Sequence, residues 1–183
     1  AGRPHGERRA DGTFVRAVAS AAACVPAQLL QDTSFEASLD GSGPWASTSS
    51  NFGTALCDVA GCGNGGGTAT PRTGDIWAWF GGIGAAEIAT ASQAVTIPSG
   101  GTRFLNFYLW IGSAAGAAGN MNVMVDSNVV ASYPEPATPE AGYTLRSIDV
   151  STYADGGSHT IGFDYDSGGT QSNYSVDDAT LDC

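Results

Sequence analysis

The chain has 183 residues, a length that suits one domain with an appendage. Its 18 acidic side chains outnumber its seven basic ones, all arginines, and give a net charge of −11. The first 16 residues carry +2 and the remainder −13, so a basic tail precedes an acidic body. Nucleic-acid binding needs a cationic stripe that replaces the counterions around phosphates, and this body offers the opposite field. No apolar run approaches the roughly 18 residues that span a bilayer, so we expect neither a nucleic-acid partner nor a membrane span.

Composition and spacing favour an all-β fold. The apolar share of 42% is ample for a buried core, and 26 glycines supply turns. From residue 29 onward, short β-branched and aromatic segments alternate with clusters of Gly, Ser, Asn and Asp, as in β-sandwiches. Ten strands are predicted, over residues 29–36, 45–49, 75–80, 87–97, 102–111, 120–125, 129–133, 143–150, 158–164 and 175–181.

Three local patterns refine this prediction. The polar triplet 126–128 between two valine-rich runs predicts a hairpin turn, because short polar side chains tolerate positive φ. The nearly continuous apolar run 104–111 predicts a strand covered on both faces. Trp77 and Trp79 lie two residues apart on one strand face, where packing is the expected role.

Four cysteines occur, at positions 24, 57, 62 and 183. A zinc site would need C-x2-C pairs or nearby histidines, and the chain has only two histidines, far apart in sequence. We therefore predict disulfides, with Cys57 paired to Cys62 and Cys24 paired to Cys183, although Cys24 or Cys183 could instead bridge to a second copy. Disulfides indicate a secreted, extracellular protein. The glycine-rich stretch 61–74 lacks the lysine and strand-to-helix setting of a phosphate-binding loop, and is predicted to be a flexible loop pinned by the first disulfide.

Several motifs follow one another in an order that is similar to a known family. They are residues 30–36, Trp45, and residues 73–79, 92–98, 107–110 and 176–181. Together they resemble the jelly-roll, carbohydrate-binding-module-like domains of secreted bacterial proteins. The resemblance covers about residues 28–183 and implies a jelly-roll β-sandwich of two antiparallel sheets. We expect this domain over residues 27–183, preceded by an extended N-terminal arm over residues 1–26 that lies outside the resemblance. It does not imply one function, because such domains bind glycans, dock onto neighbouring domains or merely pack.

The same resemblance implies a structural calcium ion where the first and last strands meet. Its side-chain ligands would be Glu36 and Asp177, with Asp32 at a position where Asn or Asp often stands. Backbone carbonyls around Thr73 and Asp75 would complete the shell. A hard divalent ion wants six to eight oxygens, and it allows carboxylates from distant strands to tolerate each other. The alternative is that these carboxylates are solvated surface groups.

No catalytic constellation stands out. A nucleophilic hydrolase needs a base beside Ser or Cys, and the body has only His159, which is expected at the surface. A glycosidase needs two carboxylates about 5 to 10 Å apart, and the sequence singles out no such pair. We therefore expect a protein that is not an enzyme.

The N-terminal arm carries the functional hypothesis. If residues 14–24 are extended, small apolar side chains line one face, so this segment could complete the sheet of another copy by strand addition. The assembly residues would be Phe14, Val15, Arg16, Ala17, Val18, Ala19 and Ala21. Two alternatives are a short alanine-rich helix and a linker from a larger secreted enzyme. We predict a secreted structural subunit that forms a head-to-tail filament, a homo-polymer joined through its basic arm and acidic body.

The alternative function is that of a carbohydrate-binding module. Polysaccharide would then be the partner, and exposed aromatic side chains would stack on sugar faces. The candidates for stacking are Trp45, Tyr133, Tyr143 and Tyr153.

Overall fold

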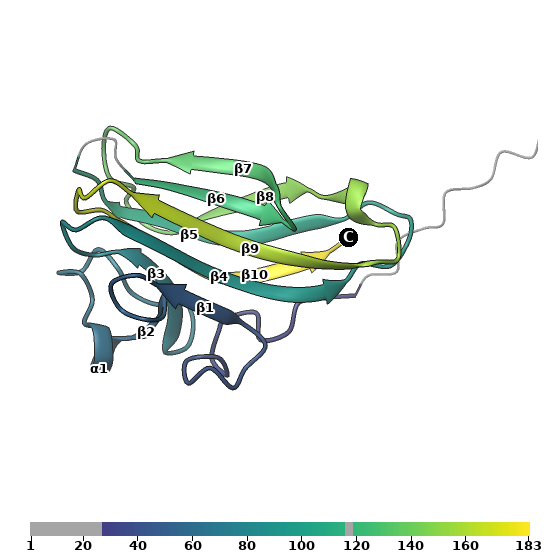
Figure 1. The fold of residues 1–183 in the computed structure, drawn as a ribbon, viewed down its shortest axis with the longest axis horizontal. Helices are drawn as coiled ribbons and strands as arrows, with labels where there is room; N and C mark the ends of the chain where they lie inside the picture. Colours follow the sequence, from purple (N-terminus) through teal and green to yellow (C-terminus); the bar gives the residue numbers. More distant parts are fainter. Residues whose placement is uncertain (1–26, 116–118) are drawn as a thin grey trace, which may run out of the picture.

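The computed structural model describes residues 27–115 and 119–183, which form two five-stranded antiparallel sheets (Figure 1). In spatial order, the first sheet consists of β1 (Ala46–Ser49), β4 (Glu87–Thr96), β9 (Ser158–Ser167), β6 (Gly119–Val125) and β7 (Asn128–Pro134). The second consists of β2 (Leu56–Asp58), β3 (Ile76–Gly81), β10 (Asn173–Asp182), β5 (Phe104–Ser113) and β8 (Thr144–Asp149). One helical turn, α1 (Val59–Cys62), and one 3-10 turn, η1 (Ser151–Tyr153), complete the elements. The predicted all-β sandwich of two antiparallel sheets is confirmed.

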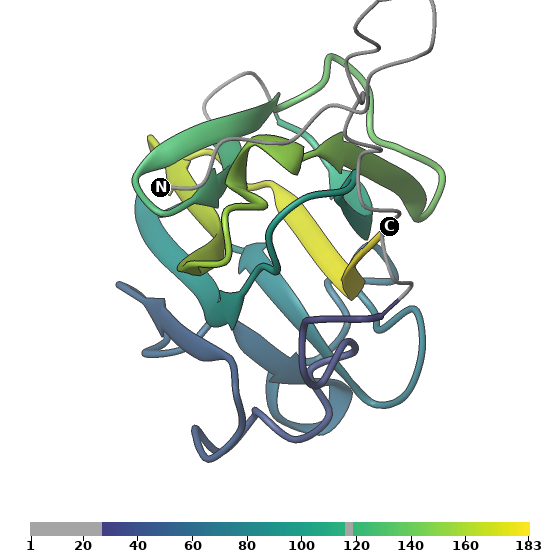
Figure 2. The same cartoon turned by 90° about the vertical axis from the view of Figure 1, so that its right-hand side faces the viewer.

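Figure 2 shows the two layers of strands. The inward-facing apolar side chains of both sheets form the core. Along β4 and β6, buried residues alternate with half-buried or exposed ones, because successive side chains of a strand point to opposite faces. Phe163 lies in an aromatic cluster, with ring centroids 5.0 Å from Phe107 and 6.1 Å from Trp45. Burial of such rings is the dominant favourable contribution to folding.

Nine of the ten predicted strands are present, and residues 29–36 are the exception. They form turns, in which Asp32 (φ 51°) and Phe35 (φ 64°) adopt left-handed backbone conformations that interrupt an extended chain. Trp45 fixes these turns, since its Nε1 donates to the Asp32 carbonyl at 2.8 Å and its ring lies 4.8 Å from Phe35. The prediction also missed β2, whose three residues are too few to show an alternation.

Two of the local predictions are confirmed and one is refined. The hairpin joins Val125 to its partner Asn128, with Asp126 at φ 56°. Trp77 is fully buried, as expected for a packing role. The apolar strand β5 is fully covered only on its inner face, whereas its outer residues are half-buried.

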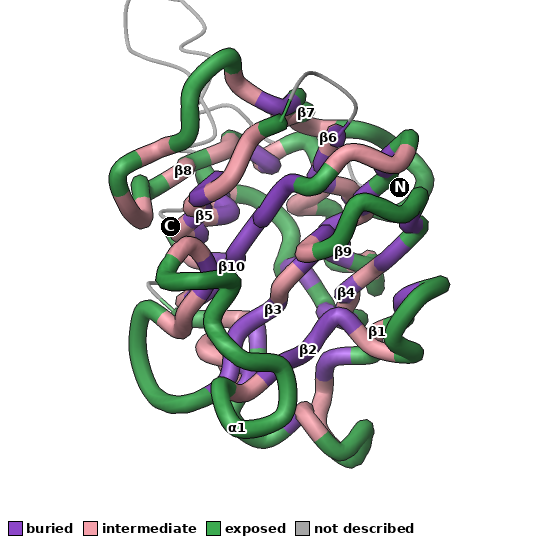
Figure 3. The backbone as a smooth tube through the Cα atoms, turned by 90° about the vertical axis from the view of Figure 1, so that its left-hand side faces the viewer, coloured by how far each residue is buried: buried purple, intermediate pink, exposed green. Residues whose placement is uncertain are grey.

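Residues 63–75, called the strap below, cross the outer face of the second sheet. Asn173 Nδ2 donates to Thr68 Oγ1 at 2.6 Å, and the Tyr143 hydroxyl donates to the Thr70 carbonyl at 2.6 Å. The Arg72 guanidinium carbon lies 3.4 Å from the centre of the Tyr108 ring. The strap was predicted to be flexible, but it is held to the sheet at several points along its length. In Figure 3, strands β3 and β10 are largely buried, and exposed turns lie in front of them.

The His159 side chain is only 10% exposed and lies between two aspartates. Its Nδ1 lies 2.8 Å from Asp126 Oδ2 in the β6–β7 turn, and its Nε2 lies 3.1 Å from Asp155 Oδ1. Hydrogen bonds to Asp126 and then to Asp155 raise the pKa of His159, and the bond to His159 lowers the pKa of Asp126. The protonated imidazole therefore joins β9 to two turns.

We expect this cluster to make stability depend on pH. Because the folded-state pKa of His159 is raised, its contribution is fully present below the unfolded value of about 6.5 and is lost as the pH rises through the higher folded value. His159→Gln should flatten the fall in Tm over that interval. Thermal melts across the pH range measure this, and an unchanged slope in His159→Gln would contradict the assignment.

Candidate functional site

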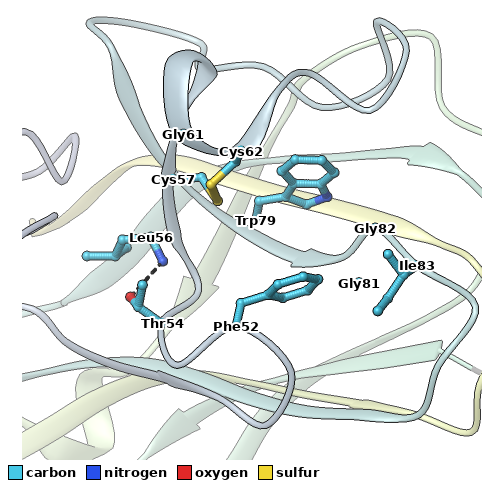
Figure 4. Close-up of a pocket in the computed structure, with 10 residues that line it drawn as sticks. All are labelled: Phe52, Thr54, Leu56, Cys57, Gly61, Cys62, Trp79, Gly81, Gly82 and Ile83. Atoms are coloured by element: carbon cyan, nitrogen blue, oxygen red, sulfur yellow. Dashed lines mark hydrogen bonds between the residues drawn. A yellow bond between two sulfur atoms is a disulfide. The ribbon is translucent and has the colours of Figure 1, made fainter.

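A pocket of about 420 Å³ opens beside β2 and β3, where three loops meet (Figure 4). Its volume lies within the usual range for small-molecule sites, about 300 to 1,000 Å³. The lining residues come from the β1–β2 connection, the β2–α1 segment, and β3 with its following loop. They are Phe52, Thr54, Leu56, Cys57, Gly61, Cys62, Trp79, Gly81, Gly82 and Ile83.

Phe52 and Ile83 are large apolar side chains that remain exposed, at 55% and 42% of their surface. In Figure 4 both border the same space as the Trp79 indole. A turn presents Phe52, because Ser49 Oγ accepts from the Phe52 amide at 3.1 Å and the Gly53 amide donates to the Ser49 carbonyl at 2.9 Å. Clustered exposed apolar side chains of this kind mark interaction sites.

Trp79 is held by its neighbours in the second sheet. Its Nε1 donates to Asn173 Oδ1 at 3.0 Å, and its ring stacks on Trp77 with centroids 6.0 Å apart. Gly82 leaves room for the indole, since a Cβ there would lie 3.0 Å from Trp79 Cζ2. The Gly82 φ of +91° also suits glycine alone. The tryptophan is therefore fixed before any ligand arrives.

A buried carboxylate joins the two sides of the pocket. Glu87 is only 2% exposed, and its Oε2 accepts from the Gly81 amide at 2.7 Å. Its Oε1 accepts from Ser49 Oγ at 2.5 Å, the same hydroxyl that caps the Phe52 turn. Both side-chain oxygens thus have partners, as buried polar atoms require.

The disulfide between Cys57 and Cys62 forms another wall, with Cα atoms 5.8 Å apart. This pairing confirms the prediction, and it is compatible with an extracellular location. Inside the closed loop, Asp58 Oδ1 caps α1 by accepting from the Gly61 amide at 2.5 Å.

The chemistry of the pocket is mostly apolar. None of the ten described residues that line it carries a charged side chain, and Thr54 supplies a hydroxyl. Its Oγ1 accepts from the Leu56 amide at 3.1 Å. The pocket can therefore cover an apolar surface of a ligand and add a small number of hydrogen bonds.

The four aromatic residues proposed for sugar stacking do not line this pocket. Trp45 is 1% exposed and packs in the core, so its prediction as a stacking platform is wrong. Tyr133 packs edge-on against Phe107 at 6.0 Å. Tyr143 lies against Trp110 at 5.7 Å, and burial raises the pKa of Tyr143. Tyr153 packs against His159 at 5.5 Å.

Sequence reasoning missed Phe52 and Ile83 and assigned Trp79 to packing. A signal was present for Phe52, since an aromatic residue between Asn51 and Gly53 lies in a turn and has no strand to bury it. For Ile83, the flanking glycines indicated a loop but not its neighbours in space.

Two of the predicted calcium ligands hold the end of the strap. Asp177 Oδ2 accepts from the amides of Arg72 at 2.7 Å and Thr73 at 3.0 Å. Glu36 Oε1 accepts from the amides of Asp75 at 3.0 Å and Ile76 at 2.9 Å. Sequence-distant carboxylates thus tie this segment down, with or without an ion.

The remaining ligands fit a calcium site in part. Asp32 Oδ2 accepts from the Ala37 amide at 3.1 Å and from Ser38 Oγ at 2.6 Å, and so closes its own turn. Within residues 27–115 and 119–183, no three His, Cys, Asp or Glu side chains gather as a metal group would. Glu36 and Asp177 would hold the ion together with backbone carbonyls, which are the oxygen donors that calcium prefers. Burial raises the pKa of Asp177 to about 6, despite the amides that donate to it.

Calcium remains a prediction, and a melting experiment tests it. An ion that binds only the native state raises Tm by mass action, so calcium should raise Tm relative to a chelator. Glu36→Gln should lose most of this rise, because it keeps an oxygen for the strap amides but removes the charge. Asp166→Asn, an exposed carboxylate on β9, is the control. Equal Tm values with calcium and with chelator would contradict the predicted calcium site.

Other predicted residues lie outside the described part of the chain. They are Cys24 and the assembly residues Phe14, Val15, Arg16, Ala17, Val18, Ala19 and Ala21. Cys183 Sγ lies 3.3 Å from Arg103 Nη1, and its pairing with Cys24 remains a prediction. Over the described ranges, no helix has the length and apolarity needed to cross a membrane.

Comparison with known proteins identifies the fold. No family model and no curated protein sequence matches the chain. A family 61 carbohydrate-binding module, TmCBM61, solved with β-1,4-galactotriose, is similar, with a TM-score of 0.60 and 16% identity over 85% of this chain and 97% of that one. A family 16 carbohydrate-binding module has a TM-score of 0.52 and 15% identity over 84% and 98%. The K3 adhesin domain of Lys-gingipain from Porphyromonas gingivalis W83 has a TM-score of 0.54 and 14% identity over 85% and 98%.

At these identities the likeness concerns the fold. The chain has the jelly-roll β-sandwich fold that carbohydrate-binding modules share, as its resemblance to them implied.

Proposed function

We propose that this chain is a non-catalytic carbohydrate-binding module of a secreted protein, and that the pocket beside β2 and β3 holds the glycan. The observation that carries the proposal is the exposed Phe52 ring, which borders the same pocket as the Trp79 indole. Sugar rings have apolar C–H faces, and aromatic side chains cover such faces well. The fold supports this function by analogy only.

The pocket is organised before binding. The Trp79 indole is hydrogen-bonded and stacked, the Phe52 turn is capped by Ser49, and a disulfide closes the neighbouring loop. A preformed site loses little conformational entropy when a ligand binds. The preformed pocket therefore supports glycan binding without a conformational change of the module.

The lining chemistry supports a binding role over hydrolysis. Glycoside hydrolysis needs a carboxylic acid and a carboxylate on opposite sides of the bond. The described lining residues include no carboxylate and no histidine. The buried Glu87 lies behind the pocket wall, and its two side-chain oxygens accept hydrogen bonds from Ser49 Oγ and the Gly81 amide.

Removal of the Phe52 ring tests the proposal. Full burial of such a side chain is worth about 1.5 to 3 kcal/mol, so Phe52→Ala should raise the Kd for a glycan by about tenfold or more. Leu145→Ala, which truncates an equally exposed apolar side chain on β8, should bind normally. Calorimetry against soluble neutral polysaccharides measures both. Equal affinity of Phe52→Ala and the parent chain would exclude this pocket.

The charge distribution supports a second proposal, the filament formed by strand addition. The first 16 residues carry +2, whereas residues 27–183 hold 16 acidic side chains and three arginines, a net charge of −13. Opposite charges favour association of the arm of one copy with the body of the next. The full chain should then form polymers. The substitutions Ala17→Asp and Ala19→Asp introduce charges on the apolar face of the arm, so the variants should stay monomeric. Light scattering that finds only monomers of the parent chain would refute assembly.

A further inference from the structure

A second pocket, of about 360 Å³, adjoins the first on the β1 side. Thr54 lines both pockets, so they meet at the point where the chain passes from β1 to β2. The second pocket is more polar, with Ser38, Asp40 and Ser47 in its wall. Leu39, Ala46 and Trp45 also line it, but Trp45 is only 1% exposed and offers no free ring face. We infer that the glycan site continues past Thr54 into this second pocket, and that it binds an extended, uncharged oligosaccharide. This inference rests on the proposed function.

The boundary between the pockets is fixed in place. Ser47 Oγ accepts from the Ala55 amide at 2.8 Å and donates to the Thr90 carbonyl at 3.0 Å. Thr54 Oγ1 accepts from the Leu56 amide. The junction is thus tied to both sheets, through β4 on one side and β2 on the other. The residue shared by the two pockets is therefore held in one position, as a continuous site would require.

The two pockets suit different parts of a sugar chain. The first offers aromatic and aliphatic surface for a ring face, as described above. The second offers the exposed Asp40 carboxylate, whose Oδ1 accepts from the Ser42 amide at 2.9 Å and from Ser42 Oγ at 2.6 Å. These bonds lower the pKa of Asp40, so the group stays ionised. A carboxylate accepts about four hydrogen bonds, which leaves capacity for sugar hydroxyls.

Charge selects against acidic glycans. Asp40 is the only charged side chain in either wall, and it would repel a uronate or a sulfate. The three described arginines are already committed. Arg72 pairs with Asp178, Arg146 pairs with Glu140, and Arg103 is 4% exposed. With a net charge of −13, residues 27–183 would also repel a polyanion at a distance.

Oligosaccharide ladders test the inference on the full chain. The probes are neutral cello-, manno-, xylo- and galacto-oligosaccharides of increasing length, with polygalacturonate as the acidic polymer, measured by calorimetry. In the ladder that binds, affinity should rise about tenfold once the chain is long enough to reach Asp40. Asp40→Ala should abolish this gain and leave the shortest ligand unaffected, whereas Phe52→Ala should weaken every length.

Asp149→Ala is the matched control, because Asp149 Oδ1 makes the same pair of hydrogen bonds with Ser151, far from the pocket walls in sequence. Affinity that depends on Phe52 but not on ligand length would overturn the extended site and leave the proposed function intact. Tight binding of polygalacturonate would overturn the preference for uncharged ligands. Glycan binding that is insensitive to Phe52→Ala would overturn the proposed function instead.

Discussion

The buried carboxylate of Glu87 is the interaction on which the pocket depends. It lies on β4 of the first sheet, yet it accepts from the Gly81 amide on β3 of the second. Through Ser49 it also reaches the turn that carries Phe52. A carboxyl group buried between two sheets is costly unless its oxygens have hydrogen-bond partners, and here the partners belong to the two sides of the pocket. The bonds that satisfy the buried carboxyl group therefore also join the two walls.

The strap lies over the outer face of the second sheet and limits the exposure of its aromatic side chains. Trp77, Tyr108 and Trp110 stand on its outer face, where a bare sheet would present a broad aromatic surface. Asp177 and Glu36 hold the strap amides, and Arg72 lies over Tyr108, so this surface is partly covered. Tyr108 and Trp110 are half-buried, like Trp79, whereas the Phe52 ring at the pocket stays exposed. The outer face of the sheet serves mainly to support the pocket.

Local signals carried most of the correct sequence predictions. Alternation located nine strands, and the close spacing of Cys57 and Cys62 identified their disulfide, because both features depend on neighbours in sequence. Residues 29–36 were predicted as a strand, because the left-handed φ values of Asp32 and Phe35, in turns that contact Trp45, leave no mark in the local hydrophobic pattern. The pocket was not predicted at all. Phe52, Cys62 and Ile83 come from separate segments that only the folded sheets bring together. Hydrophobic periodicity predicts strands and helices but does not predict the conformation of loops.

The position of the site in the sequence has an evolutionary consequence. The walls of both pockets fall between Ser38 and Ile83. The strands at the centre of the sheets, β9 and β10, come from the other end of the chain. Insertions or exchanges in the early loops would therefore reshape the two pockets and leave the central hydrogen-bonding ladders intact. A fold partitioned in this way lets its surface cavities diversify by local change, with little penalty in folding.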